Sequence, residues 1–413
     1  MKILFLNAYF KPEIIAFTHL EEDLIDGLLK ANNELFVICP TPSRGISKEM
    51  VNEYKSKKKE TLYDGRVSVR RFWAPREGKN PLIRAFRYFW CNFRERRIAA
   101  KYKDIDLIFA VSTPPTQGLL AGKLAKRLGC PFVYSLQDVF PDSLVTTGLS
   151  KEGSLLFKTG RKIENKTYAH ASKIVVISES IKQNLLNKEV PEEKIAVIPN
   201  WIDTKAVRPV PRENNRLYEE LGIVRDKFTV LYAGNMGAAQ GAGVILDAAE
   251  RLCDNADIQF VIFGGGAEFE AAKARAEALP NVFIHPLLPQ ERVPEVYSLG
   301  DLALITCKRG TGSAGMPSKT WTIMACGTPI LAAFDTDSEL ANILAQANAG
   351  ECVEPENAEA LAKAILAFAK RPKEDQPNGG RAYVEKYASK ELCVGKYVDI
   401  LMHMMEDTYK ENV

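Results

Sequence analysis

Residues 310–329 combine the residue types that bind a phosphate group: glycines, hydroxyls and a lysine. The segment reads Gly-Thr-Gly-Ser-Ala-Gly-Met-Pro-Ser-Lys-Thr-Trp-Thr-Ile-Met-Ala-Cys-Gly-Thr-Pro. It follows an apolar run, and a short helix is expected from about Pro317 to Gly327. Free backbone N–H groups at a helix start attract an anion, and Lys319 adds a positive charge. The same pattern is equally compatible with a tight turn whose glycines only supply positive φ.

Three further loops in the second half of the chain directly follow apolar runs. They begin at Gly234, Gly264 and His285. Ligands of open α/β sheets bind at the carboxyl ends of the strands, so four such loops together predict a nucleotide site. Glycine-rich loops offer N–H groups to a diphosphate, and residues 286–288 offer an apolar wall to a flat base. The sequence contains neither a dinucleotide fingerprint after its first apolar run nor a P-loop.

Apolar runs that alternate with amphipathic segments form the scaffold that must position these loops. Continuous Val, Ile, Leu and Phe runs are typical of parallel strands that are buried on both faces. In the first half they span 2–8, 35–40, 67–72, 107–111, 132–137, 173–178 and 195–199. In the second half they span 228–233, 258–263, 282–285, 302–307, 329–334 and 351–353. The predicted fold class is α/β, with two doubly wound, Rossmann-like sheets.

A chain of 413 residues, with 46% hydrophobic and 26% charged residues, is expected to form two globular domains. A polar, proline-bearing stretch near 200–215 predicts the linker, and the expected parts are 1–200, 201–380 and a closing helical segment, 381–413. Eight cysteines without C-x-x-C spacing favour reduced thiols in the cytosol, and no metal site is expected. No apolar run is long enough to predict a signal peptide or a spanning helix.

Basic residues are concentrated in one stretch, although the net charge is only +3: residues 44–103 contain 18 Lys or Arg and 6 Asp or Glu. Within 81–101, five large apolar side chains recur at helical spacing, namely Leu82, Phe86, Phe89, Trp90 and Phe93. Arginines flank them, which is typical of an amphipathic helix on an anionic membrane surface. The alternative is a helix packed on the core with a solvated basic face. Nucleic acid is not an expected partner, because no recognition motif accompanies the charge.

Several motifs resemble those of glycosyltransferase family 4, and the resemblance covers essentially the whole chain. They are Tyr232-Ala-Gly-Asn-Met-Gly, Phe263-Gly-Gly-Gly, Val197-Ile-Pro-Asn-Trp-Ile-Asp, Val176-Ile-Ser-Glu and Met324-Ala-Cys-Gly-Thr-Pro. Within the family the chain is most similar to the WbuB-like branch of O-antigen, capsule and colanic-acid enzymes. The motifs of that branch are Ser135-Leu-Gln-Asp-Val-Phe-Pro-Asp, Gly234-Asn-Met-Gly-Ala-Ala-Gln-Gly and Met316-Pro-Ser-Lys.

The resemblance implies a GT-B fold, in which two Rossmann-like domains face each other across a cleft. It implies that the C-terminal domain binds a nucleotide sugar, that the N-terminal domain binds the acceptor, and that the closing helix returns to the N-terminal domain. The chain departs from the family where charged residues are usual. Two family glutamates correspond to Ala314 and Thr322, and an arginine and a lysine correspond to Asn235 and Gln240. A histidine that is frequent in the family is replaced by Gln137.

The resemblance also implies retaining transfer from a nucleoside-diphosphate sugar, with no metal and no cofactor. The expected catalytic residues are Gln137, Asp138 and Lys319, and the expected acceptor contacts are Phe10 and Glu13. The expected donor contacts are Gly234, Asn235, Gln240, Gly264, Gly265, Pro286, Leu287, Ser318, Lys319, Thr320 and Thr322. Asp138 has a plain alternative role as a loop cap, and Glu13 as an exposed loop carboxylate. His19 and His285 are expected to be structural or solvated.

The expected function is transfer of a sugar, such as an N-acetylated deoxyhexosamine, from a UDP-sugar to a polyprenyl-diphosphate-linked saccharide. This reaction belongs to O-antigen, lipopolysaccharide or capsule assembly, on the cytoplasmic face of the plasma membrane. Two alternatives stay open: a GT-B-fold UDP-sugar epimerase and a non-catalytic protein that binds sugar nucleotides. An epimerase needs acidic and histidine groups around the sugar, and the chain has few of these after its apolar runs.

Overall fold

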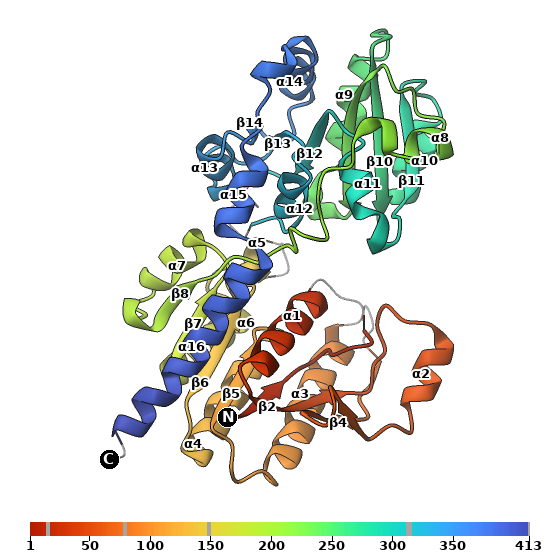
Figure 1. Ribbon diagram of the computed structural model, residues 1–413. Coiled ribbons are helices and arrows are strands. Elements are labelled where there is room, and N and C mark those ends of the chain that lie inside the picture. The colour runs from red at the N-terminus through yellow and green to blue at the C-terminus, as the bar shows by residue number, and fades with distance from the viewer. Residues whose placement is uncertain (14–16, 77–80, 147–149, 311–315, 412–413) are drawn as a thin grey trace. The chain divides into compact units, whose positions relative to one another are not determined.

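The computed structural model describes residues 1–13, 17–76, 81–146, 150–310 and 316–411. The chain divides into two compact units, and each is described by itself. The first unit comprises Met1–Pro199 together with the residues from Cys393 onward, and the second comprises Asn200–Leu392. Each unit contains one sheet whose strands alternate with helices along the chain (Figure 1). The prediction of an α/β fold with two doubly wound sheets is confirmed.

The first unit contains an eight-stranded sheet in the order β3-β4-β2-β1-β5-β6-β7-β8. Its strands are β1 (Lys2–Leu6), β2 (Glu34–Pro40), β3 (Lys59–Leu62), β4 (Val67–Phe72), β5 (Leu107–Val111), β6 (Phe132–Leu136), β7 (Lys173–Val176) and β8 (Ile195–Val197). All neighbours pair in parallel except β3, which runs antiparallel to β4. Because β1 lies between β2 and β5, the strand order reverses there, and this is the switch point where such sheets bind ligands.

Helices follow most of these strands, and local capping explains where several of them begin or end. The helices are α1 (Thr18–Lys30), α2 (Lys48–Tyr54), α3 (Pro81–Ala99), α4 (Gln117–Leu128), α5 (Asp142–Thr146), α6 (Leu155–His170) and α7 (Glu179–Leu186). The Ser154 hydroxyl accepts a hydrogen bond from Phe157 N–H at 3.1 Å, and α6 begins there. Gly129, whose φ is 69°, ends α4 in the left-handed conformation that favours glycine.

The second unit contains a six-stranded parallel sheet in the order β11-β10-β9-β12-β13-β14. Its strands are β9 (Phe228–Asn235), β10 (Ile258–Gly265), β11 (Val282–Pro286), β12 (Leu302–Thr306), β13 (Ile330–Ala333) and β14 (Gly350–Val353). Its helices are α8 (Leu217–Glu220), α9 (Gly243–Arg251), α10 (Phe269–Ala276), α11 (Val293–Tyr297), α12 (Lys319–Ala325), α13 (Glu339–Gln346), α14 (Ala358–Lys370) and α15 (Gly380–Tyr387). The switch point of this sheet lies between β9 and β12.

The closing segment consists of two helices, α15 and α16 (Lys390–Glu411), where the sequence predicts one. The backbone between them pairs with the linker, because Ile202 N–H donates to the Ala388 carbonyl at 3.1 Å and accepts from Lys390 N–H at 3.0 Å. These bonds break the helix, so α15 stays within the second unit. From Cys393 onward α16 belongs to the first unit, where the Tyr397 hydroxyl lies 3.0 Å from Ser135 Oγ in β6.

Candidate functional site

The ends of β9 and β10 lie side by side in the second unit and bring two glycine-rich loops together. Gly234 and Asn235 pair in register with Gly264 and Gly265, and Met236 N–H donates to the Gly265 carbonyl at 2.6 Å. A Cβ on Gly264 would lie 2.5 Å from Met236 Sδ, so this close approach favours glycine. Four of the residues predicted to contact the donor are therefore direct neighbours.

Lys319 begins α12, which follows β12, and it reaches Gly234 at the end of β9 across the switch point. Its Nζ lies 4.2 Å from the centroid of the Tyr232 ring, and a Cβ on Gly234 would come within 2.4 Å of that nitrogen. The electron-rich ring face attracts the cation. Desolvation nevertheless lowers the pKa of Lys319 to about 8. Among the residues that the structure describes, no carboxylate forms an ion pair with this ammonium group.

Tyr232 was not predicted as a site residue. Its hydroxyl donates to the Asn235 carbonyl at 2.8 Å, so it also fixes the end of β9. Side chains alternate along a strand, which places Tyr232 and Gly234 on the same face. That alternation, together with the Tyr232-Ala-Gly motif, is the sequence signal that could have identified this residue.

Asn235 and Gln240, which the family resemblance aligns with two cations, bind each other. Asn235 Nδ2 donates to Gln240 Oε1 at 3.2 Å, and Gly237 N–H donates to the same oxygen at 3.2 Å. The Asn235 side chain also lies close to Gly266, where a Cβ would lie 2.3 Å from Asn235 Oδ1. The two amides therefore hold the loop after β9 in one conformation, and they contribute no charge to it.

The end of β11 adds an apolar surface beside the glycines. Leu287 N–H donates to the Gly264 carbonyl at 3.1 Å, and the Leu287 side chain is 51% exposed. A Cβ on Gly265 would lie 3.4 Å from Leu287 Cδ1, which is ordinary contact. Pro286 is also exposed. This pair can contact the face of a flat ring, as predicted for a base.

The remaining predicted donor residues lie on α12 or directly before it. Ser318 is exposed and forms no capping hydrogen bond through its side chain. Thr320 is buried, and its Oγ1 has no hydrogen-bond partner in the described part of the chain. Thr322 is half-buried. Ala314 and the rest of 311–315 lie outside the described residues, so the first part of the predicted phosphate loop is not described.

Histidines and possible metal ligands are dispersed. His285 is half-buried, its ring centroid lies 5.7 Å from that of Phe263, and burial lowers its pKa. His19 is an exposed residue of α1. Within the described ranges, no three His, Cys, Asp or Glu side chains are grouped so that they could hold a metal ion.

Gln137 and Asp138 follow β6 in the first unit. Gln137 N–H donates to Ser112 Oγ at 3.0 Å, and Gln137 Nε2 donates to Ser135 Oγ at 3.2 Å, so this side chain is held in place. Asp138 is exposed, yet desolvation raises the pKa of its carboxyl group against the effect of a hydrogen bond from Ser143. Asp138 also lines a small cavity with Pro115, Tyr134, Leu136, Phe140, Glu164, Thr167 and Tyr168.

Glu13 and Phe10, the predicted acceptor contacts, are both buried in the first unit. The Glu13 carboxylate accepts backbone hydrogen bonds from Ser43 at 2.8 Å, Arg44 at 3.0 Å and Phe10 at 3.4 Å. Burial raises the pKa of Glu13. Glu13 is therefore not an exposed loop carboxylate, because it joins the loop after β1 to the loop after β2.

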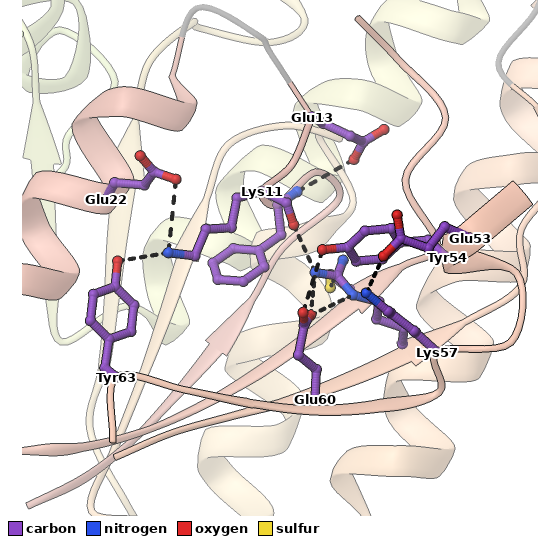
Figure 2. A network of polar contacts seen from close by, with 11 residues as sticks. Lys11, Glu13, Glu22, Glu53, Tyr54, Lys57, Glu60 and Tyr63 are labelled. Carbon is purple, nitrogen blue, oxygen red and sulfur yellow. Dashed lines mark hydrogen bonds and ion pairs between the residues drawn. The ribbon is translucent and has the colours of Figure 1, made fainter. Parts of the chain in front are cut away.

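A polar network beside Glu13 accounts for part of the basic stretch. Arg71 is buried, and it donates to Glu60 at 3.0 Å and to the Lys11 carbonyl at 2.7 Å. Figure 2 shows the Lys11 ammonium between Tyr63 and Glu22, at 2.7 Å from the Tyr63 hydroxyl and 3.9 Å from the Glu22 carboxylate. These charges are paired within the first unit, so they are not available to an external anion.

Helix α3 presents aromatic residues to the outside and buries charged ones. Phe89 is 71% exposed and Phe86 is 55% exposed, and Trp73, directly after β4, is 63% exposed. Arg87 and Glu95 of the same helix are buried, with exposures of 2% and 0%. The alternative was a helix whose aromatic face packs on the core. Phe86 and Phe89 do not fit this alternative, because their side chains are exposed. The side chain of Leu82, also in the predicted stripe, lies outside the described residues.

Comparison with known proteins identifies the family. The family described as Glycosyltransferase Family 4 matches residues 22–206, and that described as Glycosyl transferases group 1 matches residues 213–386. The chain is a family 4 glycosyltransferase. It is 25% identical over 410 residues to the putative colanic acid biosynthesis glycosyl transferase WcaI of Escherichia coli (strain K12), covering 97% of this chain and 99% of WcaI. It is 27% identical to the probable glycosyltransferase WbjE of Pseudomonas aeruginosa, over 71% of this chain and 74% of WbjE.

Solved structures confirm that this glycosyltransferase has the GT-B fold. Sucrose-phosphate synthase from Thermosynechococcus elongatus matches with a TM-score of 0.75 at 16% identity, covering 98% of this chain and 99% of that one. Anabaena HepE, in complex with UDP-glucose, matches with a TM-score of 0.68 at 18% identity. The match covers 98% of this chain and 100% of HepE. At these identities the likeness concerns the fold alone.

Proposed function

We propose that this glycosyltransferase transfers a sugar from a UDP-sugar to a polyprenyl-diphosphate-linked saccharide, with retention of anomeric configuration and without a metal ion. The observation that carries the proposal is the Lys319 ammonium group beside the paired ends of β9 and β10. No carboxylate among the described residues neutralises it, and a diphosphate has the complementary charge. The UDP-glucose bound to HepE supports a uridine donor. The name of WcaI, which includes colanic acid biosynthesis, supports a role in polysaccharide biosynthesis.

Each proposed role follows from the chemistry of the transfer. When the bond between the sugar and the diphosphate breaks, negative charge develops on the departing UDP, and Lys319 stabilises it. The backbone at Gly234 and Gly264 approaches the phosphates, and Leu287 contacts the base. Asp138 orients the acceptor hydroxyl and stabilises the positive charge that develops on the sugar, and the departing diphosphate takes the hydroxyl proton as the new bond forms on the same face of the sugar. The proposed sugar, an N-acetylated deoxyhexosamine, rests on the family resemblance.

We further propose that α3 holds the enzyme on an anionic lipid surface, where a lipid-linked acceptor would be presented. Trp90 lies at the centre of the aromatic group, with ring centroids 5.9 Å from Trp73, 6.5 Å from Phe86 and 6.2 Å from Phe93. Arg96 and Arg97 are exposed on the same helix. Aromatic rings that insert at the headgroup level and arginines that attract anionic lipid are the two components of interfacial binding. In the described ranges, no helix is both long and apolar enough to cross a bilayer.

A direct assay distinguishes these proposals from the alternatives. The purified protein is incubated with a panel of nucleotide sugars, with and without polyprenyl-diphosphate saccharides, and the products are analysed by mass spectrometry and NMR. We expect UDP release that requires the acceptor, persists in EDTA and yields a product with retained configuration. Conversion to an isomeric UDP-sugar without acceptor would indicate an epimerase instead. Binding without any conversion would indicate a non-catalytic protein.

A further inference from the structure

We propose that Tyr397 of α16 is a positioning residue: through Ser135 it fixes the carboxamide group of Gln137, so that Gln137 presents its side-chain oxygen to a hydroxyl group of the substrate. The inference rests on the proposed function, because it concerns how the first unit holds a residue that contacts a sugar. It gives the closing helix a role in the reaction as well as in packing.

A chain of hydrogen bonds joins α16 to the loop that follows β6. The Tyr397 hydroxyl lies 3.0 Å from Ser135 Oγ, and Gln137 Nε2 donates to the same oxygen at 3.2 Å. A serine oxygen has two lone pairs, so it can accept from the phenol and from the amide together. One oxygen atom thus connects Gln137 with a helix that is distant from it in the sequence.

The packing of α16 holds the phenol of Tyr397 in place. Ser135 and Tyr397 are both buried, with exposures of 0% and 2%. The Tyr397 ring packs edge-on against Phe109 of β5, with ring centroids 6.3 Å apart. Helix α16 also lies directly on α1, where a Cβ on Gly27 would collide with Val394. The position of the hydroxyl is therefore set by the way the whole helix packs.

The carboxamide of Gln137 is held through its nitrogen. The backbone N–H of Gln137 donates to Ser112 Oγ at 3.0 Å, and its Nε2 donates to Ser135 Oγ. Its Oε1 has no hydrogen-bond partner among the residues that the structure describes. An amide that is fixed through its nitrogen directs its oxygen away from that bond. Because the Gln137 side chain is only half-buried, this oxygen can accept a hydrogen bond from a substrate hydroxyl.

Stability alone does not require the polar groups of Ser135 and Tyr397. Alanine can occupy a buried strand position, and phenylalanine can occupy a buried aromatic one. When apolar groups of the same shape replace both partners of a buried hydrogen bond, the change in stability can be close to zero. The third member of the chain, Gln137, gives the two hydroxyls a role that apolar residues could not supply.

Tyr397→Phe tests the proposal, because it removes the hydroxyl and keeps the ring against Phe109. With a donor and an acceptor that the direct assay identifies, we expect kcat/KM to fall roughly three- to tenfold, the effect of one lost hydrogen bond. A raised KM for the donor places the substrate hydroxyl on the donor sugar, and a raised KM for the acceptor places it there. Tyr218→Phe removes an equally buried hydroxyl from the second unit and should behave like the wild type. Unchanged kinetic constants in Tyr397→Phe overturn the proposal.

A double-mutant cycle distinguishes positioning from a general loss of stability. Gln137→Met removes the carboxamide and is expected to lower kcat/KM by about tenfold. In that background we expect Tyr397→Phe to change kcat/KM by less than about twofold. Effects that multiply in full would mean that Tyr397 does not act through Gln137. Ser135→Ala interrupts the same chain and should reproduce Tyr397→Phe, so it decides the question if Tyr397→Phe does not fold.

NMR without substrate separates this inference from the proposed function. In protein with isotopically labelled glutamine, the side-chain amide signal of Gln137 is the one that is lost in Gln137→Met. We expect this signal to shift in Tyr397→Phe and in Ser135→Ala, and to stay in place in Tyr218→Phe. An unchanged signal in the first two variants overturns the positioning role, even if the enzyme transfers sugar. Absence of transfer by the wild type with every donor and acceptor overturns the proposed function, and the NMR signal then decides alone whether Tyr397 orients Gln137.

Discussion

Glu95 of α3 and Gln117 of α4 share one hydrogen bond, from Gln117 Nε2 to Glu95 Oε2 at 2.8 Å. Both side chains are buried, and among the described residues neither Glu95 Oε1 nor Gln117 Oε1 has a hydrogen-bond partner. Burial raises the pKa of Glu95 well above the ordinary 4.5. A protonated Glu95 has an O–H that can donate to Gln117 Oε1, and this second bond would satisfy both oxygens.

Glu95→Gln is therefore expected to raise the melting temperature at pH 8, and to raise it less at pH 5. Folded Glu95 keeps its proton to a higher pH than the unfolded chain does, so the wild-type protein loses stability as pH rises above about 4.5 towards the folded pKa. The glutamine keeps an N–H donor and does not titrate. We expect the substitution to raise the free energy of unfolding at pH 8 by about 1–3 kcal/mol, measured by calorimetry. An equal gain at both pH values, or a matching gain in the exposed control Glu152→Gln, would contradict this account.

Asp138→Asn is expected to lower kcat by about 100-fold or more, because the neutral amide cannot stabilise the positive charge that develops on the sugar. The affinity for UDP-glucose should stay within about twofold of the wild type, since Asp138 belongs to the first unit. The raised pKa of Asp138 also predicts that wild-type kcat falls on acidification at a pH above the ordinary 3.8. Steady-state kinetics with Asp104→Asn, an exposed aspartate of the same unit, provide the control. Unchanged kcat in Asp138→Asn removes this residue from the mechanism.

Replacing Phe86 and Phe89 of α3 by serine is expected to weaken binding to vesicles that contain phosphatidylglycerol. Both rings are more than half exposed, and burial of such a ring at an interface contributes about 1.5–3 kcal/mol. Arg96→Gln with Arg97→Gln should weaken binding by about 1 kcal/mol per charge and reduce its salt dependence. Co-sedimentation measures both effects, and Tyr387→Ser, an exposed aromatic residue of the second unit, is the control. If the wild type sediments equally with neutral vesicles, the anionic surface is not its partner.

Gly350→Ala is expected to destabilise the second unit by more than about 3 kcal/mol. Gly350 has a φ of 158°, and a Cβ there would lie 1.9 Å from the Ile330 carbonyl oxygen, which is backbone and cannot move aside. Gly243→Ala is the matched control, because a Cβ on Gly243 meets nothing within 4 Å. It should be neutral, or up to about 1 kcal/mol stabilising, in α9. Thermal unfolding followed by circular dichroism compares the two, and equal melting temperatures would contradict the steric argument.

The order of strands and helices was predictable because buried parallel strands are continuous apolar runs, as β5 and β13 are in full. β3 was missed because Lys59-Glu-Thr-Leu is polar and ends a lysine-rich run, and it becomes a strand only by pairing with β4. The break between α15 and α16 was missed for a similar reason. It depends on backbone bonds to Ile202, which is distant in the sequence.

The candidate site was predictable where it follows from strand ends. Gly234 and Gly264 end neighbouring strands, so their proximity follows from sheet topology alone. The contact of Lys319 with Tyr232 depends on how α12 packs, which no local pattern reveals. For Glu13 the structure excludes the alternative of an exposed loop carboxylate, although a carboxylate after Lys-Pro is usually solvated. Here the backbone N–H groups of a second loop cover it.

The division of the chain at Pro199 and Cys393 makes the second unit an insertion within the first. During synthesis the inserted unit has all its strands once Leu392 has left the ribosome. The first unit must wait for α16, whose Tyr397 contacts Ser135 in β6. The half of the protein that is translated first is thus the half that is completed last, and a nascent chain carries a first sheet that has all its strands but still lacks α16 through the entire synthesis of the second.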